Sequence, residues 1–359
     1  MTDDCLKLTV YFGESDRREG RQLLSDELID LFEREEVQAA ALLRAVEGFG
    51  IKQRLRTDRL LTLSEDLPLV AIAVDDRERI EALLPEVSSL VAGGLITLER
   101  ARLLHGEPAE DLPEETKLTI YLGRDERIEG RPAYLAVVDE LHRAGLAGAT
   151  VLLGVDGMTH RRRRRARFFS RNVEVPLLIV TVGAGAAIRT ALGRLAPQLA
   201  DPIATLERVR VCKRDGALLA QPRHLPEEDD AGLGIWQKLM VYAGEQAQHD
   251  GHPLYVQLIR RLREEGASGA TALRGIWGFA GDHPPHGDRL LSVHRHVPVV
   301  TTLVDTPDAI QRWFAIVDEL TDQAGLVTSE LVPASQAVAP AVRRGGLKLA
   351  RLRFGPPWL

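Results

Sequence analysis

The 359-residue chain contains only two cysteines, Cys5 and Cys212. Two thiols are too few for a disulfide scaffold or for a cysteine-built zinc or iron–sulfur site, because either needs more thiolates. The longest apolar runs, such as residues 175–182, fall far short of the roughly 20 residues that a membrane helix needs. Basic residues are not in excess, since 46 Lys and Arg stand against 52 Asp and Glu, for a net charge of −6. We therefore expect no membrane span and no nucleic-acid partner for the chain as a whole.

The composition describes a globular chain with a substantial interior. It is 45% hydrophobic and 27% charged, which suits two or three domains of roughly 100 to 150 residues each. The first residues show no basic segment followed by an apolar one, so we expect no signal peptide and a cytoplasmic protein.

One pattern of residues occurs three times along the chain. Leu8–Gly13 recurs as Leu118–Gly123 and again as Leu239–Gly244. In each copy a second glycine follows seven positions later, then a Gly-Phe or Gly-Met pair, and then a proline that opens an apolar run. Such self-similarity indicates tandem domains. The expected division is 1–108, 109–230 and 231–335 for the three repeats and 336–359 for a basic C-terminal tail.

The hydrophobic pattern of the first repeat changes between the periods of strands and helices. Residues 7–12 alternate as a strand does, whereas residues 23–34 have apolar positions at helical spacing. Two further strands follow, then a second helix over 76–91 and a last strand over 96–104. This order is that of the split βαβ unit. The predicted fold class is α+β, with three tandem ferredoxin-like (βαββαβ) domains whose sheets cover one another as a pseudo-trimer.

The repeated motifs resemble a PII-like family known only as domain of unknown function 190. The resemblance rests on Tyr11–Arg17 with Gly20 and Arg21, on Glu47–Gly50 and on Ser64–Pro68. It covers nearly the whole chain, three times over. It implies PII-like domains of a class that senses small molecules and regulates partners. Single-domain relatives are expected to form trimers, so this chain resembles a trimer fused into one polypeptide, and we expect it to act as a monomer.

The loop after the first strand is the first candidate ligand site. Two guanidinium groups beside a permissive backbone suit a phosphate or a carboxylate. The residues are Gly13, Glu14, Arg17, Gly20 and Arg21 in the first repeat and Gly123, Arg127, Gly130 and Arg131 in the second. Before the last strand of the first repeat, Gly93 and Gly94 can present backbone N–H groups to the same ligand. The alternatives are a helix-entry turn with solvated arginines and a helix C-cap.

Two loop segments carry further candidates. The second repeat has an arginine run that suits an acidic partner, an anionic lipid surface or nucleic acid, although a solvated loop is equally consistent with it. The run is Arg161, Arg162, Arg163, Arg164 and Arg165. The third repeat has four histidines, which are weak candidates for a divalent metal because only Asp282 accompanies them. They are His283, His286, His294 and His296.

We expect a regulatory protein and not an enzyme, because the chain has no Walker loop, no Gly-x-Gly-x-x-Gly segment and no nucleophile near a base at a recognisable spacing. The hypothesis is a small anionic effector, an adenine nucleotide by resemblance, bound in clefts between repeats. Loops would then control a target protein such as a membrane transporter or an enzyme. The alternatives are a ligand-free interaction module that uses the arginine run and the tail, and a histidine-based metal protein. The basic tail has an apolar side, and we expect it to dock on its own domain.

Overall fold

The computed structural model describes residues 2–17, 22–58, 66–105, 112–163, 175–199, 202–281, 283–287, 297–339 and 342–352. The first repeat contains β1 (Thr2–Gly13), α1 (Leu24–Arg34), β2 (Ala39–Arg44), β3 (Glu47–Phe49), β4 (Arg56–Thr57), β5 (Pro68–Asp76), α2 (Arg77–Leu90) and β6 (Gly94–His105). The second contains β7 (Thr116–Gly123), β8 (Arg127–Ile128), β9 (Arg131–Pro132), α3 (Ala133–Arg143), β10 (Gly148–Thr159), β11 (Arg162–Arg163), β12 (Pro176–Gly183), α4 (Gly185–Leu195) and β13 (Ile203–Arg208).

The segment that follows holds β14 (Arg210–Arg214) and β15 (Ala217–Leu218). The third repeat contains β16 (Trp236–Gly244), β17 (Gln248–His249), β18 (His252–Pro253), α5 (Leu254–Glu264), β19 (Ala270–Arg274), β20 (Trp277–Ala280), β21 (His286–Gly287), β22 (Pro298–Asp305), α6 (Pro307–Leu320) and β23 (Leu326–Val332). Two further strands follow, β24 (Ala334–Ala339) and β25 (Val342–Gly346). None of the described helices combines the length and the apolar character needed to cross a membrane.

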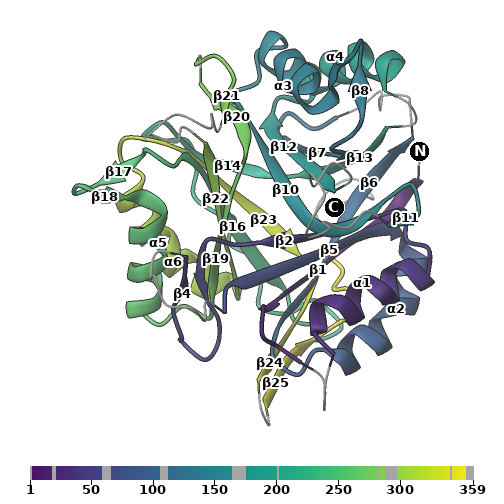
Figure 1. Cartoon of the computed structure of the whole chain (residues 1–359). Helices are drawn as coiled ribbons and strands as arrows, with labels where there is room; N and C mark the ends of the chain where they lie inside the picture. Colours follow the sequence, from purple (N-terminus) through teal and green to yellow (C-terminus); the bar gives the residue numbers. More distant parts are fainter. Residues whose placement is uncertain are drawn as a thin grey trace.

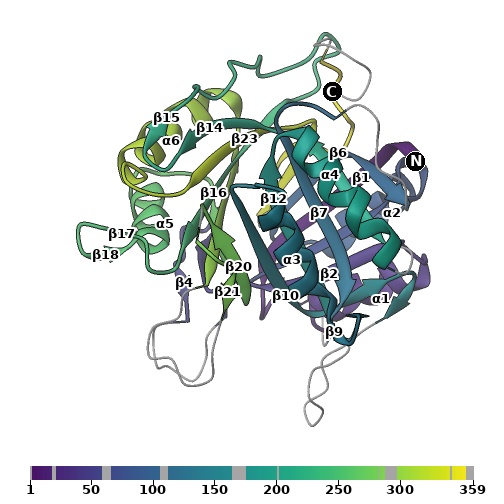
Figure 2. The same ribbon diagram turned by 90° about the horizontal axis from the view of Figure 1, so that it is seen from above.

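The helices lie in pairs on the outside of the strands. The pairs α1/α2, α3/α4 and α5/α6 occupy three separate places around the central strands (Figure 1). Figure 2 shows α3 and α4 lying across the strands of their own repeat. Each pair buries one apolar stripe, because its hydrophobic residues recur at helical spacing. Leu28, Ile29 and Phe32 of α1 and Ile80 of α2, for example, are buried in one core cluster.

The strands of the three repeats join into shared sheets. Over the residues that the structure describes, one sheet has 13 strands and another has 8, and two short hairpins are separate from both. The predicted fold class, three ferredoxin-like domains each with a sheet of its own, is therefore wrong. The physical reason is that strand edges are open to pairing with any neighbouring strand. Alternation along one strand locates its two faces but does not say which strand lies beside it.

The pairings between repeats follow two regular cycles. In the first cycle, the last strand of one repeat, or the strand that follows it, pairs with the last strand of the next. The pairs are β6 with β13, β14 with β23 and β24 with β6. In the second cycle, strands from the middle of the repeats pair across repeat boundaries, and the pairs are β10 with β2, β20 with β10 and β3 with β19. Each repeat is therefore joined to both others by backbone hydrogen bonds.

Six charged side chains lie buried where the repeats meet, and we call them the Lys–Glu ring. The first strand of each repeat supplies a lysine and the last strand supplies a glutamate, and the six are Lys7, Glu99, Lys117, Glu207, Lys238 and Glu330. Within the repeats, the Nζ–Oε2 distances are 3.1 Å in the first, 2.7 Å in the second and 2.8 Å in the third. Each lysine also contacts the glutamate of another repeat. Positive and negative charges therefore alternate around a closed ring.

The three repeats also share a separate hydrophobic core cluster. It takes residues from all three repeats, including Cys5, Tyr121, Leu152 and Leu273. Burial raises the pKa of the Cys5 thiol above its usual range, and the nearby Asp75 adds to the effect. Cys212 is also buried. Buried thiols of raised pKa are poor nucleophiles, so neither cysteine is placed to do covalent chemistry.

Two glycine-to-alanine substitutions should have opposite effects on stability. Gly157 in β10 has φ +148°, and a Cβ there would collide with the backbone oxygen of Ala40 in the paired strand of the first repeat. We expect Gly157→Ala to lower the free energy of unfolding by about 1–3 kcal/mol. Gly193 lies in α4 with open space around it, so Gly193→Ala should stabilise the protein by about 0.5–1 kcal/mol. Urea denaturation of both variants measures the two changes in stability. Equal changes would contradict the close approach of β10 to the first repeat at Gly157.

Candidate anion-binding site

The predicted loop of the first repeat is filled by the protein's own side chains. The N–H of Gly13 donates to Asp16 Oδ2 at 2.7 Å, and the guanidinium of Arg56 lies where a Cβ on Gly13 would stand. Arg56 is itself held by Asp66, with 2.7 Å between Nη2 and Oδ2. Glu14 pairs with Arg44 and Arg17 is exposed, while Gly20 and Arg21 lie outside the described residues. The described residues of this loop thus do not converge on one space.

The equivalent loop of the second repeat is similarly self-contained. Arg127 Nη1 donates to the backbone oxygens of residues 124, 125 and 126 at 3.0–3.1 Å. Arg131 pairs with Asp139 at 3.0 Å, and the N–H of Gly123 donates to Glu126 Oε1 at 2.6 Å. Gly130 has φ +80°, which suits a tight turn. In this structure Arg127 thus bonds to the backbone of the turn and Arg131 to the helix that follows it.

The double glycine of the first repeat lies at a close approach between strands. Gly94 has φ +139°, and a Cβ there would collide with the carbonyl oxygen of Tyr11 in β1. Gly93 is half-buried with open space around it. The need for glycine at position 94 is therefore explained by strand packing, without a ligand.

The arginine run is partly an anchor. Arg163 contacts Asp156 in its own hairpin, with 3.0 Å between Nη2 and Oδ2. Its Nη1 reaches Asp30 at 2.6 Å and Glu33 at 2.8 Å, both on α1 of the first repeat. Arg161 and Arg162 are exposed, and Arg164 and Arg165 lie outside the described residues. Arg163 thus fastens the second repeat's hairpin to the first repeat, and its two exposed neighbours project from that anchored base.

The histidine segment shows no coordination set in the part that the structure describes. His283 is exposed, and the Nδ1 of His286 lies 2.9 Å from the backbone oxygen of Pro284. His294 and His296 lie outside the described residues. Over the described residues, no group of three or more His, Cys, Asp or Glu side chains could hold a metal ion.

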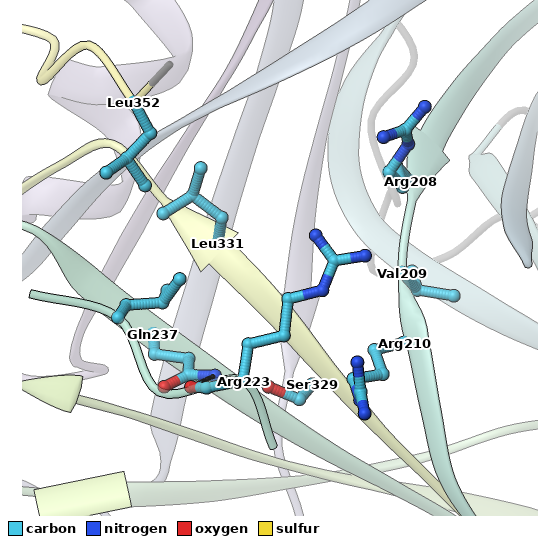
Figure 3. A pocket seen from close by; sticks show the side chains of 9 residues that line it. Arg208, Val209, Arg210, Arg223, Gln237, Ser329, Leu331 and Leu352 are labelled. Carbon is cyan, nitrogen blue, oxygen red and sulfur yellow. Dashed lines mark hydrogen bonds between the residues drawn. The ribbon is translucent and has the colours of Figure 1, made fainter. Parts of the chain in front are cut away.

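A pocket lined by three arginines lies between the second and third repeats, and we call it the arginine pocket. It is lined by Arg208, Val209, Arg210, Arg223, Leu225, Gln237, Ser329, Leu331 and Leu352. In Figure 3, Arg208 and Arg210 flank Val209 on one side, Leu331 and Leu352 lie on the other, and Arg223 reaches between them. Its volume is about 60 Å³, enough for a few waters or one small oxyanion.

The chain places these arginines through a strand junction and a held linker. Arg208 ends β13 and Arg210 begins β14, where Arg210 is paired with Ser329 of β23. The linker at Arg223 crosses over the third repeat, where its backbone oxygen accepts from Gln237 Nε2 and from Gln311 Nε2, both at 3.2 Å. Gln237 also donates to Ser329 Oγ at 2.7 Å. Amide side chains of β16 and α6 therefore set the position of Arg223.

The charged residues that line the arginine pocket are its three arginines. None of its lining residues, in the part of the chain that the structure describes, has a carboxylate. Burial lowers the pKa of Arg208, and the charge of Arg223 lowers it further. The Nε of Arg210 is buried and has no hydrogen-bond partner among the described residues. A buried donor without an acceptor is costly, and an oxyanion beside the three arginines would offset their positive charge.

Sequence reasoning missed both this pocket and the Lys–Glu ring. The sequence nevertheless contains a pattern that points to each of them. Arg208 and Arg210 directly follow the repeated Thr-Leu-Glu segment of the second repeat, and the first repeat has Arg100 and Arg102 in the same positions. The third repeat has Leu331 and Pro333 there, so it lacks both arginines. For the ring, a lysine precedes the repeated leucine of every first strand, and a glutamate occurs near the end of every repeat.

The relatives found by comparison with known proteins are about as long as one repeat of this chain. A UPF0166 protein of Methanocaldococcus jannaschii is 28% identical over 104 residues, which make up 29% of this chain and 94% of the relative. A UPF0166 protein of Aquifex aeolicus is 29% identical over 75 residues, or 21% of this chain and 71% of the relative. The model of the family DUF190, described as "Uncharacterized ACR", matches residues 5–103, 115–211 and 236–334. The chain therefore belongs to the DUF190 family and carries three tandem copies of its domain.

Proposed function

We propose that this protein is a non-catalytic regulator that binds a small anionic ligand between its second and third repeats and controls a partner protein. The observation that carries the proposal is the arginine pocket, which three arginines line without a carboxylate among the described lining residues. Guanidinium groups bind phosphate and carboxylate oxygens in a fixed geometry. The resemblance to PII-like sensors supports the regulatory role, and the position of the pocket between repeats fits a site that responds to their arrangement.

The size of the arginine pocket limits the part of a ligand that it can hold. About 60 Å³ accommodates one phosphate or carboxylate group. An adenine nucleotide would therefore place a phosphate in the pocket and leave its base outside. Leu225, Leu331 and Leu352 also line the pocket and offer apolar contacts to a ligand. The ligand class is thus an anion with a compact charged end.

Replacing Arg210 should weaken anion binding by about tenfold or more, because a hydrogen bond to a charged group contributes about 1.5–3 kcal/mol. The measurement is a thermal-shift and calorimetric series with phosphate, AMP, ADP and ATP on the native protein and on Arg210→Gln. A ligand at about 100 times its dissociation constant adds about 2.7 kcal/mol to the folded state.

The double variant Arg17→Ala, Arg127→Ala provides the matched comparison, since it also removes arginines but from the loops after the first strands. If the double variant loses binding and Arg210→Gln keeps it, the ligand site lies in the loops and the assignment to the arginine pocket is wrong. If no anion of the series shifts the native protein, the sensor proposal itself fails.

A second candidate function is a docking module for an acidic protein surface. Arg161 and Arg162 are exposed beside the anchored Arg163, which supports it. Binding through these residues would fall steeply as salt increases, because exposed charges are screened within about 10 Å at 0.1 M ionic strength. An interaction that Arg161→Ser and Arg162→Ser abolish, with anion binding intact, would favour this function.

A further inference from the structure

The strand β25 is an open edge of the larger sheet. It ends the strand order of that sheet, and among the strands that the structure describes it pairs only with β24. At the other end of that order, β1 is paired on both sides, with β5 and β6. The eight-stranded sheet ends in β15 and β4, which have two residues each. Very short end strands are a protection against pairing with other chains, and β25, with five residues, lacks it.

The backbone of β25 is accessible along its whole length. All five of its residues are exposed, and Val342 keeps 52% of its surface in solvent. Gly345 and Gly346 have no side chains, so their exposure is that of the backbone itself. Figure 1 shows the hairpin of β24 and β25 reaching out at the bottom of the view. An edge strand presents backbone N–H and C=O groups that point away from its one neighbour, and here they are open to an added strand.

The hairpin is held in place before any partner arrives. On its other side, β24 pairs with β6 over five residues. Arg343 Nη1 donates to Ser88 Oγ at 2.7 Å, and its Nη2 donates to the backbone oxygen of Ser88 at 3.0 Å. Ser88 Oγ in turn donates to Gln336 Oε1 of β24 at 2.9 Å. The edge is therefore anchored to α2, and a partner would bear most of the cost of ordering alone.

The charge of this edge selects among partners. Arg343 lies opposite Val338, which belongs to the core of the first repeat, so Arg344 and Val342 stand on the other face of the hairpin. Residues 331–359 include no Asp or Glu. Two copies paired edge to edge would bring their arginines together, and like charges on neighbouring strands are destabilising. The edge thus disfavours a second copy of this chain and favours an acidic strand.

The register of the strand specifies the pattern of that acidic partner. In an antiparallel pair, the residue opposite Arg344 is followed two positions later by the residue opposite Val342, and both stand on one face. An opposite charge suits Arg344, and an apolar, β-branched side chain suits Val342. The matching segment is therefore extended, with an acidic residue two positions before an apolar one.

We propose that β25 is the docking site for such a segment of a partner protein, which joins the larger sheet as an added strand. In this mode of recognition the backbone hydrogen bonds provide the affinity and alternate side chains provide the specificity. The inference goes beyond the proposed function, because β25 is exposed whatever the arginine pocket holds. It also assigns the partner to a surface other than that of Arg161 and Arg162.

The probe is an acetylated, threonine-rich peptide in which a glutamate stands two positions before a valine. The matched peptide has lysine in place of the glutamate. Fluorescence anisotropy measures the affinity of each peptide, and hydrogen exchange of residues 342–346 reports on backbone pairing. We expect the native protein to bind the glutamate peptide about fivefold more tightly than the lysine peptide. Bound peptide should slow the exchange of the β25 amides, because an added strand accepts hydrogen bonds from them.

Arg344→Glu should reverse the preference, so that the lysine peptide binds more tightly. A reversed preference cannot come from a failure to fold. Arg260→Glu makes the same change of charge at an exposed residue of α5 and should keep the native preference. If Arg344→Glu does not fold, Arg344→Gln is the second variant, and it should bind the two peptides equally. A native preference in either Arg344 variant would overturn the inference.

Two further results would contradict strand addition. If the glutamate peptide binds while the exchange of residues 342–346 is unchanged, the peptide is held elsewhere. If neither peptide binds the native protein with a dissociation constant below about 1 mM, β25 does not dock extended segments. A native protein that sediments as a dimer with the β25 amides already protected would show that a second copy occupies the edge, and the inference would be wrong. Anion binding is tested separately by Arg210→Gln, so either proposal can fail without the other.

Discussion

Replacing Lys117 by methionine should lower the free energy of unfolding by about 3–5 kcal/mol, because it leaves a buried charge without its partner. The Lys–Glu ring is neutral as it stands, with three lysines and three glutamates. Lys117 lies 2.7 Å from Glu207 and 2.5 Å from Glu330, and its side chain is only 3% exposed. Its removal leaves one uncompensated carboxylate among groups that water does not reach. Urea denaturation at neutral pH measures the loss.

Two further variants distinguish a charge effect from a loss of packing. Lys52→Met changes an exposed lysine and should stay within about 0.5 kcal/mol of the native protein. The double variant Lys117→Met, Glu330→Leu removes one charge of each sign, so it should be less destabilised than the sum of its two single variants. If the two effects simply add, Lys117 and Glu330 are not coupled electrostatically, and the large loss expected for Lys117→Met has another cause.

Acid should destabilise the protein steeply between about pH 4.5 and pH 2. Burial alone would raise the pKa of Glu330, but the charges of Lys117 and Lys238 outweigh it and lower that pKa to about 2. Glu99 is likewise buried, and Lys238 and Lys7 hold its pKa well below its usual range. Because both groups bind protons more readily in the unfolded chain, their stabilisation is complete above pH 4.5 and is lost as the pH falls toward 2.

The slope of the free energy of unfolding against pH is the quantity to measure. Each such carboxylate contributes about 1.4 kcal/mol per pH unit within that range. Denaturation at pH 5, 4 and 3 should show the native protein and Glu265→Gln, an exposed control, falling together. Glu330→Gln starts lower at pH 5 but falls less steeply, because it has lost one of the titrating groups. Parallel curves for Glu330→Gln and the native protein would contradict the lowered pKa.

Local pattern was enough to find the repeats and the helices, but not the neighbours of the strands. Residues 7–12 alternate, and in the structure Leu8 and Val10 lie in one core cluster with residues of the helices. The alternation also groups Lys7 with Thr9 and Tyr11 on the opposite face, which a single sheet would turn to water. In the structure, that face is buried against the other repeats, so Lys7 is 7% exposed. Only the association of the repeats, which alternation does not encode, makes Lys7 a buried residue.

The candidate site could not be predicted from the sequence for a related reason. The loops after the first strands have the permissive glycines and the arginines of an anion site, yet their described residues bond to one another. The arginine pocket instead draws Arg208 from a strand end, Arg223 from a linker and Leu352 from the C-terminal tail. These residues lie far apart along the chain, and only the fold brings them together. The tail itself was expected on its own domain, whereas β24 pairs with β6 of the first repeat.

The pairing of β24 with β6 also constrains the way in which the protein can be made. On the ribosome, the first repeat emerges with β6 lacking this partner and with Lys7 and Glu99 able to contact only each other. The second repeat supplies Glu207 to Lys7, but Glu99 must await Lys238 of the third. Contacts between such distant parts of a chain form slowly. The nascent protein therefore carries unfinished strand edges and unmatched charges until the third repeat and β24 have been synthesised, which makes synthesis the stage at which it most needs protection from aggregation.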